Sequence, residues 1–136
     1  MAADIDALWD YAKPAESEAR FREALKTETG DTALEIETQI ARTFGMRRDF
    51  VRANSMLDAV AARTSGNTAP RVRIRYLLER GRTLNSSGQF EKAKPLFSDA
   101  FQLAQRENEV LLAIDAAHMF GFSKNLDEAM SWNQVA

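Results

Sequence analysis

The chain has 136 residues, 45% of them hydrophobic, which is enough apolar material for one domain with a continuous core. It has no cysteine and one histidine, which excludes disulfides, thiolate zinc sites and histidine-rich metal clusters, and we expect no cofactor. Eighteen basic and twenty acidic residues give a net charge of −2, so no overall charge attracts nucleic acid, and we do not expect a nucleic-acid partner.

Charged residues interrupt every hydrophobic stretch, so no window approaches the roughly 18 apolar residues that a membrane-spanning helix needs. The first ten residues carry aspartates and no Lys or Arg, unlike the basic start of a secretory signal. We therefore expect a cytoplasmic protein that does not enter a membrane.

Prolines and glycines are sparse and no long stretch alternates apolar with polar residues, which predicts an all-α protein of about eight short helices. In the N-terminal region, 1–30, Leu8 and Trp9 fit a short helix, and a second helix follows around Phe21. Next, the segment Thr32-Ala-Leu-Glu35 has the form of a capping box and predicts a helix start at Thr32; Asn125-Leu-Asp-Glu128 is a similar signal.

Three helical hairpins follow in the pattern, at 34–64, 74–106 and 110–136. In the middle hairpin, small residues at Gly81 and Ala93 let two helices approach closely, while Phe90 and Phe97 fill the space beside them. A turn at Gly88 separates its two helices, and Arg48 takes the corresponding place in the first hairpin.

The third hairpin follows the pattern less well, because Asn133 stands where a large apolar residue is expected. The chain stops at Ala136 within a helical stripe, although a helical array needs a polar cap over its last apolar surface. We expect this hairpin to be incomplete, or its end to be covered by another copy of the chain.

The middle hairpin resembles a tetratricopeptide repeat, whose pattern asks for small residues at the two crossings and large apolar residues at Leu84, Phe90 and Phe97. It lacks the tryptophan of that family's pattern. The resemblance is strongest over 34–106 and implies a single domain, 1–136, folded as a right-handed solenoid of antiparallel helix hairpins. Such a fold implies a concave groove that binds a protein or peptide. The alternative is an ordinary helical bundle whose apolar stripes only look repetitive.

Five arginines lie between Arg71 and Arg82 in an otherwise slightly acidic chain. By helical spacing, some of them share a face that is separate from the apolar stripe and that would look into the groove. We predict a groove that is arginine-rich at one end and apolar at the other, and therefore an acidic, amphipathic partner segment. The predicted partner-binding residues are Arg42, Arg75, Leu78, Arg82, Leu111, Ile114, His118 and Phe122.

Two other functions stay open beside this non-catalytic scaffold. The first is self-assembly into a homo-oligomer through Met130, Trp132 and Val135 near the C-terminal end. The second is a small helical enzyme in which Asp115 orients His118. The second has little support, because no Gly-x-Ser-x-Gly segment and no glycine-rich nucleotide loop is present.

Overall fold

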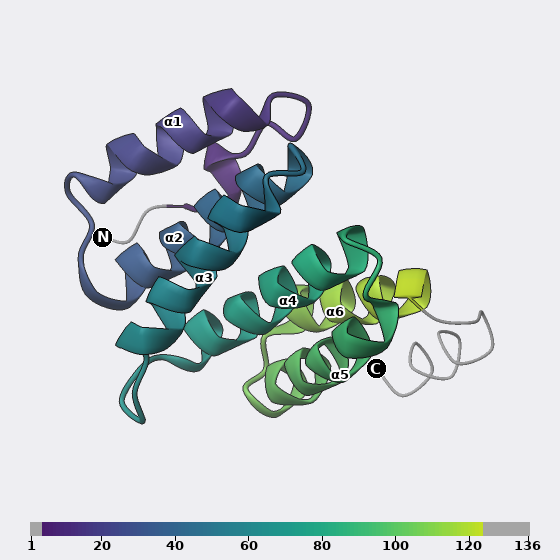
Figure 1. The fold of residues 1–136 in the computed structure, drawn as a ribbon. Helices are drawn as coiled ribbons and strands as arrows, with labels where there is room; N and C mark the ends of the chain where they lie inside the picture. The colour runs from purple at the N-terminus through teal and green to yellow at the C-terminus, as the bar shows by residue number, and fades with distance from the viewer. Residues whose placement is uncertain (1–3, 124–136) are drawn as a thin grey trace.

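The computed structural model describes residues 4–123, which form helices and contain no β-strand (Figure 1). The all-α prediction is confirmed for this part of the chain. A 3-10 turn at Asp6–Leu8 precedes the α-helices, which are α1 Pro14–Leu25, α2 Gly30–Met46, α3 Phe50–Arg63, α4 Pro70–Ser86, α5 Phe90–Arg106 and α6 Val110–Ser123. None of these helices is long and apolar enough to cross a membrane.

Each helix packs against the next one along the chain, and short connections make neighbours run in opposite directions (Figure 1). Two further contacts join helices that are not consecutive: α2 packs on α4, and α4 on α6. The backbones of α3 and α5, both within the described region, do not approach each other. The helices α2, α4 and α6 therefore lie together on one side, with α4 at the centre.

Three of the connections have the same turn. The middle residue of each has a left-handed backbone, with φ of 61° at Arg48, 87° at Gly88 and 60° at Asn108. In each turn, the amide of the residue after this middle residue donates to the carbonyl five positions before it, as Gln89 N does to Leu84 O at 2.8 Å. This Schellman turn normally takes glycine, because a side chain is strained at positive φ. The correspondence of Arg48 with Gly88 is confirmed, and Asn108 completes the set.

The predicted start of α2 is wrong. The helix begins at Gly30, with Thr29 as its cap residue, so Thr32 already lies inside the first turn. The carboxylate of Glu35 does not cap the helix; it accepts hydrogen bonds from Arg71 and Arg75 on α4. The other capping signal, at Asn125–Glu128, lies outside the described residues.

The crossing of α4 and α5 is as close as the sequence predicts. A Cβ atom placed on Gly81 would lie 2.5 Å from Cε1 of Phe97, which leaves room only for glycine. Ala93 and Phe97 are fully buried. Phe90 differs from the prediction: it is 49% exposed, because it is the first residue of α5 and lies beyond the crossing.

Candidate functional site

Charged and polar side chains line the contact of α4 with α2 and α6, where an apolar core would be expected. On α4, Arg75, Glu79 and Arg82 are spaced by four and three residues and so share one face. We call this face, with its partners on the neighbouring helices, the polar face. Its residues are Glu35, Thr38, Gln39 and Arg42 of α2, Arg75, Glu79 and Arg82 of α4, and Asp115 of α6.

One half of the polar face belongs to a wider set of ion pairs, which also includes Arg71, Asp6 and Glu109 outside the face itself. Arg75 has only 7% of its side chain exposed, and its Nε lies 2.7 Å from Oε1 of Glu35. Arg75 Nη2 also lies 3.7 Å from a carboxylate oxygen of Asp6, in the N-terminal turn. Arg71 joins Glu35 to Glu109, with distances of 3.1 and 2.5 Å. These arginines already have carboxylate partners within the chain.

The other half is centred on Glu79, whose side chain is 2% exposed. Its Oε2 accepts hydrogen bonds from Arg82 Nη1 at 2.5 Å and from Gln39 Nε2 at 3.3 Å. Its Oε1 is buried and has no hydrogen-bond partner in the described structure, and Nε of Arg42 lies 3.9 Å from it. A buried carboxylate oxygen without a donor is costly, which marks this atom as unusual.

Arg82 lies between two acids, since its guanidinium also donates to both carboxylate oxygens of Asp115. Burial alone would lower the pKa of Arg82, but the neighbouring charges of Glu79 and Asp115 raise it further than burial lowers it. The group therefore stays charged inside the protein.

Arg42 is held differently from the other arginines of the polar face. Its guanidinium carbon lies 5.3 Å from the ring centre of Trp9 and 5.0 Å from that of Tyr11, and the two rings stack at 4.6 Å. Trp9 is fixed in turn by a 3.0 Å hydrogen bond from its Nε1 to Gln39. Arg42 makes no hydrogen bond to any residue within 4–123, and 24% of its side chain is exposed. Arg42 is therefore held by cation–π contacts, and its donors have no hydrogen-bond partner among residues 4–123.

A pocket of about 300 Å³ opens beside these groups, between α2, α4 and α6. We call it the central pocket. It combines the charged groups of the polar face with small and flexible apolar walls. Its lining residues are Arg42, Gly45, Met46, Glu79, Arg82, Thr83, Ser86 and Met119.

The structure brings together Arg42 and Arg82, which both flank Glu79, but it separates the predicted apolar residues from them. Leu78 lies in the core with 1% of its surface exposed, so it cannot contact a ligand. Leu111 is exposed on α6, and Ile114 lines a different hollow, between α5 and α6. His118 is exposed, while the side chain of Phe122 lies outside the described set.

The predicted couple of Asp115 and His118 is not supported by the geometry, because both oxygens of Asp115 accept from Arg82. Among residues 4–123, no group of three His, Asp or Glu side chains is arranged to hold a metal ion. The three residues predicted for self-assembly, Met130, Trp132 and Val135, lie beyond the described region.

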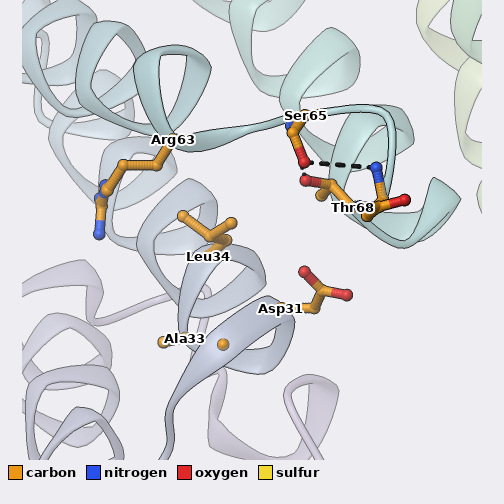
Figure 2. A pocket seen from close by; sticks show the side chains of 8 residues that line it. Asp31, Ala33, Leu34, Arg63, Ser65 and Thr68 are labelled. Carbon is orange, nitrogen blue, oxygen red and sulfur yellow. Dashed lines mark hydrogen bonds between the residues drawn. The ribbon is translucent and has the colours of Figure 1, made fainter.

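Another hollow, of about 400 Å³, lies where the start of α2 meets the loop after α3 (Figure 2). Figure 2 shows Asp31 and Leu34 of α2 on one side, and Ser65 and Thr68 of the loop on the other. Its charged groups already have partners: Asp31 accepts from the amide of Ala69, and Arg63 pairs with Glu37. We therefore regard it as a weaker candidate than the central pocket.

The sequence-based prediction missed Glu79, Gln39, Trp9 and Met119. For Glu79 a signal existed: it lies four residues after Arg75 and three before Arg82, so it shares their helix face. A glutamate in that place is the natural counter-ion of both arginines. For Trp9 no sequence signal existed, because its contact with Gln39 joins residues thirty positions apart.

Comparison with protein-family models, with curated proteins and with solved structures finds no match to this chain. The fold and the geometry of the polar face are therefore the basis for assigning a function.

Proposed function

We propose that this chain is a non-catalytic scaffold that binds a peptide segment of a partner protein on its polar face. In this proposal the helices form a tetratricopeptide-like, right-handed solenoid, with α2, α4 and α6 lining its inner side and α3 and α5 outside. The packing of α2 on α4 and α4 on α6, with α3 and α5 apart, supports that arrangement. The cytoplasmic location predicted from the sequence remains part of the proposal.

The observation that carries the proposal is the central pocket with its two incompletely bonded charged groups. Arg42 holds unoccupied donors at the rim, and Glu79 holds an unoccupied acceptor beneath it. Well-packed apolar residues often stabilise a fold as well as a buried ion pair does, so a polar layer at this depth is not needed for stability. A binding role accounts both for the pocket and for the hydrogen-bonding groups of Arg42 and Glu79 that have no partner in the described part of the chain.

The ion pairs change the expected chemistry of the partner. Arg75 and Arg82, predicted to attract an acidic segment, already have carboxylates within hydrogen-bonding distance. An acidic partner would have to displace Glu35, Glu79 or Asp115 to reach them. The proposal therefore keeps an amphipathic peptide but no longer depends on a strongly acidic one.

A display library of random peptides, selected on the full chain, tests this function. Methionine labelled with ¹³C in its methyl group gives a local readout, because Met46 and Met119 line the central pocket. We expect selected peptides to shift these two signals and to leave Met56, which packs in the separate core formed around α1 and α2, unchanged. A library that yields no binder, or binders that leave Met46 and Met119 unmoved, would remove the proposal.

Self-assembly is the second candidate, favoured by one feature of α6. Val110, Leu111 and Ile114 are 65%, 77% and 45% exposed, and Val110 and Ile114 line an apolar hollow of about 470 Å³ next to α5. Exposed apolar clusters of this kind occur at protein contacts. Light scattering over a dilution series decides it: a mass that stays that of one chain at every concentration excludes self-assembly.

A further inference from the structure

We infer that the central pocket recognises a neutral side-chain amide, that of glutamine or asparagine, presented by the bound peptide. This inference rests on the proposed function and deepens it. Three features of the described structure lead to it: an unoccupied donor, an unoccupied acceptor beside it, and a balance of charge around the two.

The donor is Arg42. Its guanidinium makes cation–π contacts with Trp9 and Tyr11, whose rings stack on each other, and it makes no hydrogen bond within the described residues. A guanidinium presents several N–H groups in one plane, and a cation–π contact does not give them a hydrogen-bond acceptor oxygen. Arg42 can therefore donate to a ligand oxygen without giving up a hydrogen bond to another residue of 4–123.

The acceptor is Oε1 of Glu79. It lies 3.9 Å from Nε of Arg42, too far for a direct hydrogen bond, and it receives no other donor. A polar group that lies alongside the two can accept from Arg42 and donate to Glu79 at the same time, once the Glu79 side chain turns its buried Oε1 toward the pocket. A primary amide does this well, because it carries an acceptor oxygen and two donor hydrogens on adjacent atoms.

The local charge does not favour a charged ligand. Arg42 and Arg82 are positive and Glu79 and Asp115 negative, so the four groups sum to zero. A ligand carboxylate would face the buried Glu79, and a ligand ammonium would face Arg42 and Arg82. The volume of about 300 Å³ is small, and Met46 and Met119 supply flexible apolar walls for the methylenes of a glutamine side chain.

Three display libraries test the inference, each of random peptides with the central position fixed as Gln, Glu or Leu. They are selected in parallel on the full chain, and binders are measured by affinity and by the methyl signals of Met46 and Met119. We expect the Gln library to enrich most strongly. In its binders, replacement of the fixed Gln by Glu or Leu should weaken binding about tenfold, as expected for hydrogen bonds to charged groups.

The matched protein variant is Arg42→Met, which keeps an unbranched, flexible side chain and removes the donors of the guanidinium. Arg42 is preferable to Glu79 here, because changing Glu79 also disturbs Arg82 and Gln39. Loss of the preference for Gln in Arg42→Met, with the Met56 signal unchanged, supports the inference. Gln preference that persists in Arg42→Met, or equal enrichment of all three libraries in binders that shift Met46 and Met119, overturns the amide and leaves the proposed function standing. Failure of all three libraries to shift these signals overturns both.

Discussion

Two helix contacts of this protein, both involving α4, are built in opposite ways. The contact of α4 with α5 is apolar and so close that Gly81 touches the ring of Phe97. The contact of α4 with α2 and α6 is made through charged side chains, with Glu79 and Arg75 almost fully buried. The side of α4 that faces α5 is thus an apolar packing surface. The side that faces α2 and α6 instead buries charged residues, which helix packing does not require.

This difference between the two contacts indicates which of them has room and hydrogen-bonding groups for a ligand. At the crossing of the apolar contact, Gly81 and Phe97 leave no space for an added atom, so a change there acts on the fold. The polar face has an unpaired carboxylate oxygen, unoccupied donors and a pocket. The predictions below test whether the two contacts differ in stability as well as in chemistry.

The largest effect is expected for Glu79→Ala. The substitution leaves Arg82 buried with Asp115 as its remaining carboxylate and removes an acceptor from Gln39. Removing one partner of a buried ion pair is strongly destabilising, and we expect a loss of about 3 kcal/mol in the free energy of unfolding, measured by urea titration.

Glu23→Ala is the control, because Glu23 pairs with Lys26 at the surface, with 73% of its side chain exposed. Surface pairs contribute little, so its unfolding midpoint should hardly move. Equal effects of the two substitutions would show that the polar face is not buried as described.

A smaller loss of stability is expected for Gly81→Ala. Alanine normally stabilises a helix relative to glycine, but here the new methyl group would lie 2.5 Å from Phe97 Cε1. We expect a loss of about 1 to 3 kcal/mol, measured by the same titration. Adding Phe97→Leu should restore part of it, since the ring edge that causes the clash is then gone.

Gly66→Ala is the matched control, because nothing lies within 4 Å of a Cβ atom built on Gly66. Its stability should stay close to that of the parent chain. If Gly81→Ala were as stable as Gly66→Ala, the close crossing of α4 and α5 would be wrong.

An intermediate case is Glu18 on α1, which joins α1 to α2 through Arg47 and also pairs with Arg22. Burial raises the pKa of Glu18, but the hydrogen bonds from Arg47 and Arg22 outweigh it, and the pKa lies below its ordinary value. A lowered pKa gives stability above the unfolded pKa of about 4.3, which is lost as the pH falls through the folded pKa.

We therefore expect Glu18→Gln to cost about 1 kcal/mol at neutral pH and to cost progressively less as the pH falls below about 4. Unfolding titrations of both proteins at several pH values measure this difference. A cost that grows toward acid pH would have the wrong sign for the ion pairs described.

The smallest effect is expected for Phe90→Ala. The ring is 49% exposed at the start of α5, outside both contacts of α4 compared above. We expect the free energy of unfolding to change by about 0.5 kcal/mol or less. A loss of several kcal/mol would show that Phe90 fills the core, as the sequence pattern predicts.

Local patterns in the sequence predicted the helices and the close crossing well, because both depend on spacing within one segment. Gly81 opposite Phe97 and the turn at Arg48 could be recognised from the repeat alone. The exposed position of Phe90 could not, since the same pattern holds whether a residue lies at the crossing or one turn beyond it. The capping box did not mark the helix start, because α2 already begins at Gly30, and Glu35 pairs instead with arginines of another helix.

The site was predicted only in part, for a related reason. Helical spacing correctly brought Arg42 and Arg82 near each other, but spacing says nothing about which acid neutralises each arginine. On α6, helical spacing predicted that Ile114 faces the groove, whereas Asp115, one residue later, pairs with Arg82 of α4. One position along a helix turns a side chain by about 100°, enough to move it from one groove to the next.

The most direct test of the central claim compares binding and stability in a single variant, Arg42→Ala. Arg42 makes cation–π contacts with Trp9 and Tyr11, its ion pair with Glu79 is long at 3.9 Å, and it makes no hydrogen bond within residues 4–123, so its loss should lower the free energy of unfolding by about 1 kcal/mol or less. Binding of a peptide selected on the parent chain should weaken about tenfold or more. Undiminished binding, or a loss of stability as large as that of Gly81→Ala, would contradict the assignment of the polar face to partner recognition.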